Sequence, residues 1–437
     1  MHRLLLPRIG LLSLLLVFVA GAGASEIKLR DTRLTPAEIK IVDWISARET
    51  EMLAELKTHV EINTGTANIE GLNRYRKILQ QNLDELGFVT SEHSSKALEV
   101  LTCQGGTQEI AKHLLGKRRG SSKSRILLNG HMDTVFSKHD EFQTLIIEKS
   151  GWLKGPGVAD MKGGLVVMVN ALRALHHAGL LQQANLTVLI NSDEEIGSLG
   201  SRALIEKLAV QHDIGLVFEG SYDNLVTRER KGLGQVRLKI TGREAHAGGA
   251  HDDGVSANLE LAHKIIEIEK LTDYARKTTV NVGVINGGEK RNTVPGCADA
   301  YIDLRYPTRK AGDQLKKNIL SVVNNSSTSY ARYPGLPKIE SWAVLHRPVK
   351  PQNGQVDALI AQAMALSKVI GEPIEGTRYS GGGTDGSITQ NMGLPTMDSL
   401  GMDGGGAHSS REQSSVQSLM ARTKLAAIMI ARLISQP

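Results

Sequence analysis

The sequence predicts an α/β protein whose main domain is built on a mixed sheet and is interrupted by a smaller domain of βαββαβ order. Short apolar runs that end in Gly, His or acidic residues alternate with helical patterns along most of the chain, which is typical of α/β folds. Between about residues 231 and 345 the predicted elements instead follow the ferredoxin-like order. The 437 residues allow two or three domains, and an aromatic content of 4% with 45 glycines suits aliphatic packing and tight turns.

Residues 1–24 have the features of a secretory signal peptide. A basic start with Arg3 and Arg8 precedes an apolar core, and Ala22-Gly23-Ala24 forms a small-x-small cleavage site. The apolar run from Ile9 to Ala24 is shorter than the roughly 20 residues of a membrane-spanning helix. We therefore expect cleavage, no membrane contact afterwards, and export of the mature protein to the periplasm or the medium.

The net charge argues against a nucleic-acid partner. The formal charge is +6, and loss of the signal peptide would remove Arg3 and Arg8, which leaves only a mild basic excess. The basic cluster at residues 117–119, with Lys123 and Arg125, lies in a Gly/Ser-rich stretch. We interpret it as a solvated turn.

The chain has two cysteines, Cys103 and Cys297, which fall in different predicted domains. An exported protein can form disulfides. Because these two residues are far apart in the sequence, we nevertheless expect both to be free and buried.

Helical and strand patterns follow one another along the chain. A first helix is predicted over residues 36–60, with Thr35 as its N-cap and Pro36 at its first position. In the inserted domain, strands are predicted at 233–241, 279–285, 298–304 and 338–345, and helices at 255–270 and 312–323. Elsewhere, helices are predicted at 71–86, 354–369, 385–391 and 414–434, and a strand at 98–103.

His131 and Asp133 follow a buried strand predicted at residues 126–130. Residues two apart on an extended chain point to the same side, so both side chains can face one pocket. A metal-bound His is usually held through its other ring nitrogen by a second group such as a carboxylate, which Asp133 would supply. The alternative interpretation is a solvated loop that contains a His by chance.

Acidic residues stand at the ends of two further segments. Asp160 ends the Gly-rich loop GPGVADMKGG, residues 155–164, just before a helix. It is either the N-cap of that helix or a ligand. The apolar strand in residues 186–198 runs into Asp193-Glu194-Glu195. Three adjacent carboxylates repel one another and require protons or cations nearby.

The same pattern recurs at Glu219, which ends the strand 213–220, and at His408, which follows a run of glycines. Ligands of open α/β sheets collect at the carboxyl ends of the strands. Two His with several carboxylates and no Cys suit a hard-to-borderline metal ion, zinc first. The sequence therefore predicts a metal site at this edge of the sheet.

Together these motifs resemble the aminoacylase/glutamate carboxypeptidase family of two-zinc metallopeptidases. The resemblance covers nearly the whole mature chain and rests on GHMDTVF, GPGVADMKGG, SDEEIGS, FEG, the inserted domain and a late His. INGGEKRNTVPGCADAYIDLRYP and SGGGTDGS resemble the glutamate carboxypeptidase (carboxypeptidase G) branch. This resemblance implies a zinc exopeptidase catalytic domain in residues 25–230 and 346–437, with a lid and dimerisation domain in 231–345.

The resemblance also implies two zinc ions per chain. The implied ligands are His131 and Glu219 for one ion, Glu195 and His408 for the other, and Asp160 as the bridge between them. Asp133 would orient His131, and Glu194 would act as general base and then as general acid. Two metal ions that share a carboxylate can activate a water molecule, whose proton a nearby carboxylate then carries.

Substrates of such an enzyme end in a carboxylate, for which Arg is suited. Arg305 is the first candidate and Arg347 the second, although either could instead form a structural ion pair. The backbone around Gly382 could approach the same carboxylate, unless it is a plain flexible loop. The family also implies a homodimer through the inserted domain. His246, with Asn292 as a further candidate, would reach the partner's site as an oxyanion donor, and the alternative is an exposed loop His.

The predicted function is that of an exported zinc-dependent carboxypeptidase. It would hydrolyse the amide bond before a C-terminal amino acid, with glutamate as one candidate, in a small peptide or N-acyl amino acid. An N-acyl amino-acid deacylase or a dipeptidase would use the same metal site. A non-catalytic exported binding protein is the alternative of another class, and Glu194 argues against it because a binder needs no unliganded carboxylate beside the metals.

Overall fold

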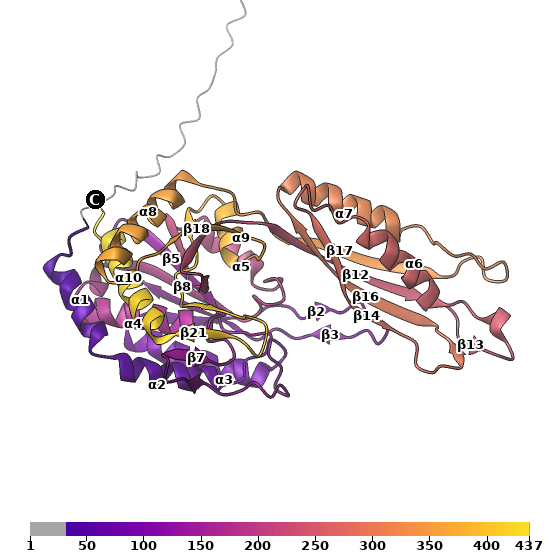
Figure 1. Ribbon diagram of the computed structural model, residues 1–437, viewed down its shortest axis with the longest axis horizontal. Coiled ribbons are helices and arrows are strands. Elements are labelled where there is room, and N and C mark those ends of the chain that lie inside the picture. The colour runs from indigo at the N-terminus through magenta and orange to yellow at the C-terminus, as the bar shows by residue number, and fades with distance from the viewer. Residues whose placement is uncertain (1–31, 437) are drawn as a thin grey trace, which may run out of the picture.

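The computed structural model describes residues 32–436, which form a main domain and a smaller inserted domain, each with its own hydrophobic core (Figure 1). The fold class predicted from the sequence is confirmed. The predicted signal peptide, residues 1–24, lies outside the described residues. Within residues 32–436, no helix has the length and apolar character needed to cross a membrane.

A six-stranded mixed sheet forms the centre of the main domain, in the order β1-β4-β8-β5-β9-β19. Its strands are β1 (Val89–His93), β4 (His113–Arg118), β5 (Arg125–His131), β8 (Asn185–Asn191), β9 (Ile214–Val217) and β19 (Thr396–Met397). β8, β5, β9 and β19 run parallel, whereas β1 and β4 pair antiparallel. Because β8, β5 and β9 are neighbours, the residues that follow them meet at one edge of the sheet.

Helices cover both faces of this sheet because alternate strand residues are apolar on both sides. Leu128 and Val188 face a core with α1 (Pro36–Ser46), α2 (Glu49–Val60), α3 (Ile69–Glu85), α4 (Lys162–His177), α8 (Gly354–Val369) and α10 (Val416–Ile434). Leu127 and Leu189 face a second core with α5 (Arg202–Ala209) and α9 (Asp385–Asn391).

The prediction of a single helix over residues 36–60 is wrong, because α1 and α2 are separated at Ala47 and Arg48. Thr35 caps α1 as predicted, through a capping box with Glu38. The break changes the chain direction, so that the apolar sides of both helices reach the main core.

A second sheet of short strands brings the late part of the chain beside the Gly-rich loop. Its order is β18-β11-β10-β20-β21-β7-β6. The strands are β6 (Ile146–Ile147), β7 (Trp152–Lys154), β10 (Ser221–Tyr222), β11 (Leu225–Arg230), β18 (Gly376–Ser380), β20 (Asp403–Gly405) and β21 (Gln413–Ser415). Because β20 pairs with β10 and β21 pairs with β7, the loop that carries His408 lies at the carboxyl edge of the main sheet.

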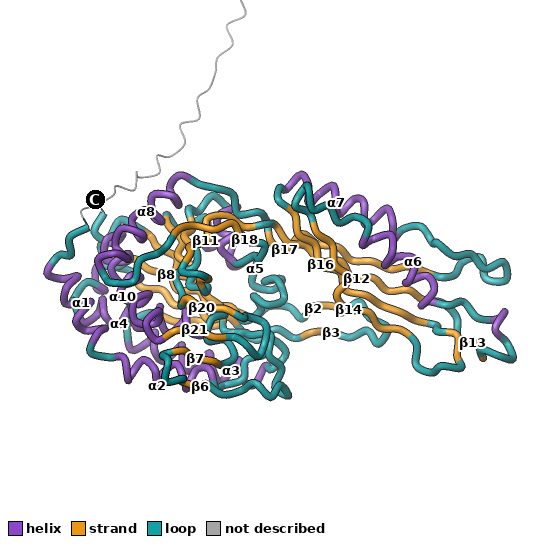
Figure 2. Tube along the Cα trace, viewed as in Figure 1, coloured by secondary structure: helices purple, strands orange, loops and turns teal. Residues whose placement is uncertain are grey.

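The inserted domain is a four-stranded antiparallel sheet in the order β14-β16-β12-β17, with two helices on one face (Figure 2). Its elements are β12 (Gly232–Thr241), α6 (Ala257–Glu269), β14 (Thr279–Gly287), β16 (Cys297–Tyr306), α7 (Arg309–Val323) and β17 (Lys338–Arg347). Val236 and Leu238 of β12 pack under the helices. Leu233, Gln235 and Arg237 alternate with them and lie on the opposite face, which we call the open face.

The strand predicted at residues 98–103 is shorter than expected. It forms β2 (Leu98–Glu99), which pairs with β3 (Thr107–Gln108) after a turn at Gly105 and Gly106, whose φ angles are 64° and 116°. These two strands extend from the main domain toward the inserted sheet (Figure 1). We call residues 98–108 the arm.

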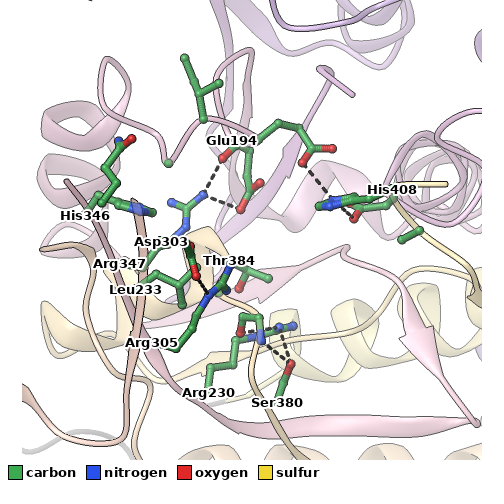
Figure 3. A pocket seen from close by; sticks show the side chains of 18 of the residues that line it. Glu194, Arg230, Leu233, Asp303, Arg305, His346, Arg347, Ser380, Thr384 and His408 are labelled. Carbon is green, nitrogen blue, oxygen red and sulfur yellow. Dashed lines mark hydrogen bonds and ion pairs between the residues drawn. The ribbon is translucent and has the colours of Figure 1, made fainter. Parts of the chain in front are cut away.

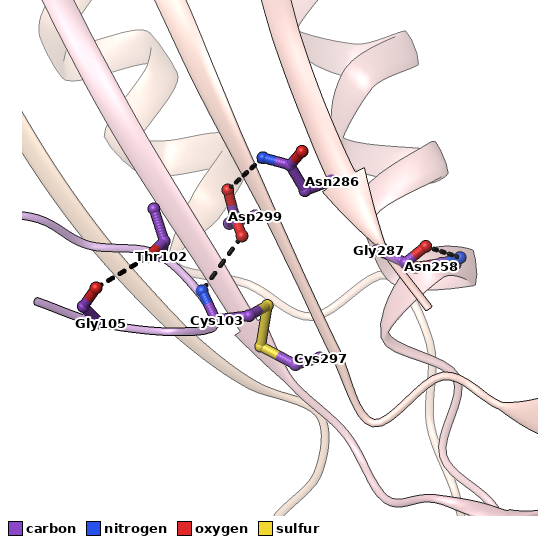
Figure 4. Close-up of a disulfide and its surroundings, with 8 residues drawn as sticks. All are labelled: Thr102, Cys103, Gly105, Asn258, Asn286, Gly287, Cys297 and Asp299. Carbon is purple, nitrogen blue, oxygen red and sulfur yellow. Dashed lines mark hydrogen bonds between the residues drawn. A yellow bond between two sulfur atoms is a disulfide. The ribbon is translucent and has the colours of Figure 1, made fainter. Parts of the chain in front are cut away.

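The expectation of two free cysteines is wrong, because Cys103 and Cys297 form a disulfide (Figure 4). Their Cα atoms lie 5.8 Å apart although the residues are separated by 194 positions. The arm carries Cys103 to the start of β16, where its backbone N–H also donates to Asp299 Oδ2 at 3.1 Å. Distance along the sequence did not reveal this meeting, because it depends on how far the arm projects from the main domain.

Candidate metal centre and active site

The side chains predicted to bind metal converge where β5, β8 and β9 end. His131 is the last residue of β5, Glu194 and Glu195 follow β8, and Glu219 follows β9. His408 enters from the loop after β20, with a positive φ of 63°. The recurring strand-end pattern therefore reflected a real meeting of side chains.

His131 is buried, and Asp133 holds its Nδ1 side. Its Nδ1 lies 3.0 Å from the Asp133 carbonyl oxygen and 3.4 Å from Asp133 Oδ1. The Asp133 carboxylate also accepts hydrogen bonds from the Thr66 hydroxyl at 2.9 Å and from the backbone N–H groups of Glu194 and Glu195, both at 3.1 Å. Asp133 therefore fixes both the imidazole and the loop that carries the two glutamates.

Asp160 lies between the two imidazoles. Its Oδ1 is 3.3 Å from His131 Nε2 and its Oδ2 is 3.3 Å from His408 Nε2. Glu219 Oε1 lies 3.5 Å from His131 Nε2, and Glu195 Oε2 lies 3.2 Å from His408 Nε2. The N-cap alternative for Asp160 is wrong, because α4 begins after Met161 and lacks a side-chain cap.

Glu194 is separate from these contacts and pairs with Arg347 (Figure 3). Arg347 Nη2 donates to Glu194 Oε1 at 2.5 Å and to the Glu194 carbonyl at 2.9 Å. Its Nη1 donates to Ser198 Oγ and Asp385 Oδ1, both at 2.8 Å. Arg347 is 2% exposed and also lines the active-site cavity, so these ion pairs hold it at the cavity wall beside the site.

The electrostatics of the cluster fit a cation. Burial lowers the pKa of His131, but Glu219, Asp133 and Asp160 outweigh this effect and raise its pKa well above the ordinary value. Hydrogen bonds to Asp160 and Glu195 raise the pKa of His408 to about 11. Burial and Asp160 raise the pKa of Glu195 to about 7.

The donor set itself also fits a metal ion. His131 Nε2 is buried and makes no hydrogen bond, although two carboxylates lie close to it. Ligand atoms of His131, Asp160 and Glu195 lie within 4.8 Å of one another, as do those of His131, Glu194 and Glu219. Crowded carboxylates around an unbonded imidazole nitrogen are what a divalent ion would neutralise.

The cluster opens into a cavity of about 700 Å³ between the two domains. Arg305 and Gly382, predicted to bind the substrate carboxylate, line it. Arg305 Nε donates to Asp303 Oδ2 at 2.6 Å and its Nη1 to the Gly381 carbonyl at 3.2 Å (Figure 3). The side chain is therefore placed at the cavity wall with one carboxylate partner already present.

His246 and Asn292 do not join this site. His246 ends β13 (Ala245–His246), which pairs with β15 (Thr293–Val294), and Asn292 directly precedes β15. This small ribbon lies at the end of the inserted domain far from the main domain (Figure 1). The exposed His246 ring accepts hydrogen bonds from the backbone N–H groups of Gly248 and Gly249. Within this chain neither residue can touch a substrate bound in the cavity.

Sequence reasoning missed two buried groups that hold the site together. Glu412 accepts hydrogen bonds from the backbone N–H groups of Gly157, Ala159 and Asp160 at 2.8–3.1 Å, which fixes the Gly-rich loop. Asp385, the second partner of Arg347, belongs to the SGGGTDGS stretch. That stretch supports the family resemblance and contains Gly382, and its single acidic residue was the signal for Asp385.

The geometry points first to a class of protein. This site is suited to metal-dependent hydrolysis. It has a cluster able to hold metal ions, a separate buried carboxylate and a substrate cavity beside the inserted domain. Residues 127–432 match the model of peptidase family M20/M25/M40. The chain therefore belongs to this family and is a metallo-exopeptidase of the hydrolase class, which confirms the resemblance described above.

Several relatives cover most of the chain. It is 29% identical to carboxypeptidase G2 of Pseudomonas sp. (strain RS-16) over 418 residues, 94% of each protein. It is 30% identical to acetylornithine deacetylase of Proteus mirabilis (strain HI4320) over 280 residues, which are 60% of this chain and 68% of that enzyme. The fold is similar to that of the dipeptidase Dug1p from Saccharomyces cerevisiae, with a TM-score of 0.70, 14% identity and coverage of 92% and 99% of the two chains.

Proposed function

We propose that this protein is an exported two-zinc hydrolase that releases a C-terminal amino acid, with glutamate as one candidate, from a small peptide or N-acyl amino acid. The observation that carries the proposal is the position of Asp160 between His131 and His408, with Glu194 beside the cluster but paired elsewhere. His131 and Glu219 would hold one ion and Glu195 and His408 the other, with Asp160 shared.

When bound, the ions would polarise the scissile carbonyl and lower the pKa of a water molecule. The residues of the chain then supply positioning and proton transfer. Burial raises the pKa of Glu194 well above its ordinary value, while Arg347 opposes that shift. Glu194 can therefore accept a proton from the attacking water and return it to the leaving nitrogen. Asp133 fixes the position of the His131 ring and of the Glu194 backbone relative to each other through its hydrogen bonds.

Arg305 would bind the C-terminal carboxylate of the substrate, with the backbone around Gly382 as a neighbour. The sequence similarity to carboxypeptidase G2 supports release of a C-terminal amino acid. The similarity to an acetylornithine deacetylase supports the second candidate, an N-acyl amino-acid deacylase with the same catalytic residues.

A hydrolysis screen tests the proposal. Dipeptides and N-acyl amino acids that differ in the C-terminal residue, each with its C-terminal amide as control, would be offered to the protein with zinc and after chelation. We expect turnover of acids, weak turnover of amides, loss with chelator and recovery with zinc or cobalt. No turnover of any acid by the zinc-loaded protein would support a binding protein instead.

We also propose a homodimer through the inserted domain. On the helix side of the inserted sheet, the edge strand β14 exposes Ile285 and the adjacent α6 exposes Leu259 and Ile266, and these apolar side chains are not covered by any of the described residues 32–436. The strand β13, which ends in His246, lies at the end of the inserted domain far from the main domain (Figure 1). A partner chain that covers this surface would provide a site for His246 to complete.

Subunit mixing tests this shared site. Glu194→Ala and His246→Ala homodimers should each be nearly inactive. After subunit exchange about half of the dimers are mixed, and in each of these one site carries both changes and the other neither, so activity should return to about a quarter of wild type. Verified exchange without regained activity would show that His246 does not serve the partner.

Export remains a proposal that rests on the features of residues 1–24. Expression of the full chain in a Gram-negative host should yield a periplasmic protein that begins at Ser25. A cytoplasmic product that retains its first residues would contradict this proposal.

A further inference from the structure

Arg237 is a buried cation in the wall of the active-site cavity, and none of the carboxylates in residues 32–436 forms an ion pair with it. It is 7% exposed and lines the cavity. Its Nη1 donates to the Glu99 carbonyl of the arm at 3.0 Å, and its Nε is buried without a hydrogen bond. The guanidinium lies 5.3 Å from the ring centres of both Tyr301 and Trp342.

A charge buried in this way is unfavourable unless an opposite charge compensates it. The stacking on two aromatic rings and one carbonyl bond offset only part of that penalty. The two acidic residues that flank Tyr301 on β16, Asp299 and Asp303, form no ion pair with Arg237 and have other partners. Asp303 accepts from Arg305, and Asp299 accepts from the Cys103 backbone and from Asn286 (Figure 4).

Arg237 and Arg305 lie on the same open face of the inserted sheet. Arg305 is opposite Leu233 on β12, whereas Tyr301 is opposite Arg237, four residues further along. At ~3.3 Å per residue, the two positions are about 13 Å apart along the strand. Gln235 lines the cavity between them.

The arm lies beside Arg237, at the end of the cavity wall that begins at Arg305. Its Gln108 lines the same cavity, and the disulfide between Cys103 and Cys297 fixes the arm to the inserted sheet (Figure 4). The carbonyl of Glu99 and the rings of Tyr301 and Trp342 hold the guanidinium in place without neutralising it. Such a preorganised, uncompensated donor is suited to an anion that arrives from the cavity.

We propose that Arg237 forms a second anion subsite of the active-site cavity, which binds a carboxylate of the substrate remote from its C-terminal carboxylate. The inference deepens the proposed function, because it takes Arg305 as the site of the first carboxylate. The preferred substrates are then elongated diacids, with the second carboxylate on the side of Arg305 away from the metal cluster.

Calorimetric titration of the zinc-loaded full-length protein tests the subsite without turnover. The probes are α,ω-dicarboxylic acids from glutarate to dodecanedioate, each compared with its monomethyl ester. We expect an optimum chain length at which the diacid binds roughly 10–100-fold more tightly than the ester, the range for a hydrogen bond to a charged group. Equal affinity of diacid and ester at every length would overturn the proposal, and this comparison requires only the wild-type protein.

Two variants then locate the subsite. Arg237→Met keeps an apolar stem between Tyr301 and Trp342 and should abolish the preference for the diacid. Lys239→Met removes a cation two residues along the same strand, outside the cavity lining, and should retain it. Retention of the preference in Arg237→Met would overturn the assignment to Arg237. Because binding is measured directly, absence of hydrolysis would count against the proposed function and not against the subsite.

Discussion

The disulfide between the arm and the inserted domain makes a quantitative prediction about stability. It closes a covalent loop between residues 194 positions apart. In the chain-entropy description, a loop of that length restricts the unfolded chain by about 5 kcal/mol. Native disulfides typically contribute about 2–4 kcal/mol. Replacement of both Cys103 and Cys297 by Ser should therefore lower the free energy of unfolding by about 2–5 kcal/mol.

Urea unfolding followed by tryptophan fluorescence measures this change. Trp342 reports on the inserted domain, and Trp44 and Trp152 report on the main domain. Variants that keep only Trp342, or only Trp44 and Trp152, would therefore follow the unfolding of each domain separately. The wild-type protein in a phosphine reductant should unfold like the double Ser variant. Peptide mapping without reductant should recover Cys103 linked to Cys297. An unchanged free energy of unfolding, with the linkage verified in the wild type, would refute the reasoning.

Two further predictions concern buried ionisable groups. Burial lowers the pKa of His59 from 6.5 to about 4, so the unfolded chain binds a proton that the native state excludes. His59 should therefore reduce stability by about 3 kcal/mol as the pH falls from 6.5 to 4, and His59→Gln should remove that part of the pH dependence of urea unfolding. An identical acid slope in the variant would contradict the assignment. Arg347→Met leaves Glu194 and Asp385 buried without their cation and should destabilise the fold by about 3–5 kcal/mol, measured by the same unfolding assay. A loss below 1 kcal/mol would indicate that the pair is not formed.

Residues at strand ends were predictable because the sequence records them directly. An apolar run that stops at His131, at Glu194 or at Glu219 indicates a polar group at the end of a buried strand. The order β8-β5-β9, which makes these strand ends neighbours, cannot be predicted from any local sequence pattern. The expectation that these residues meet in one site was supported by the family resemblance.

Other features depended on contacts between distant segments. The short strands that place His408 have two or three residues each, too few for a periodic signal. The contact of Cys103 with Cys297 required knowledge of the arm. The ion pairs of Arg347 could not be assigned from the sequence, because its partners Glu194 and Asp385 are far from it along the chain.

The central claim is that Glu194 transfers the proton while its neighbours hold the metal. The most direct test measures metal content and hydrolysis of an N-acyl glutamate together, in the wild type and in Glu194→Gln. The account predicts equal zinc content in both proteins and a rate loss of roughly 10²–10⁴-fold in the variant. A variant that loses zinc, or one that retains both zinc and wild-type turnover, would contradict it.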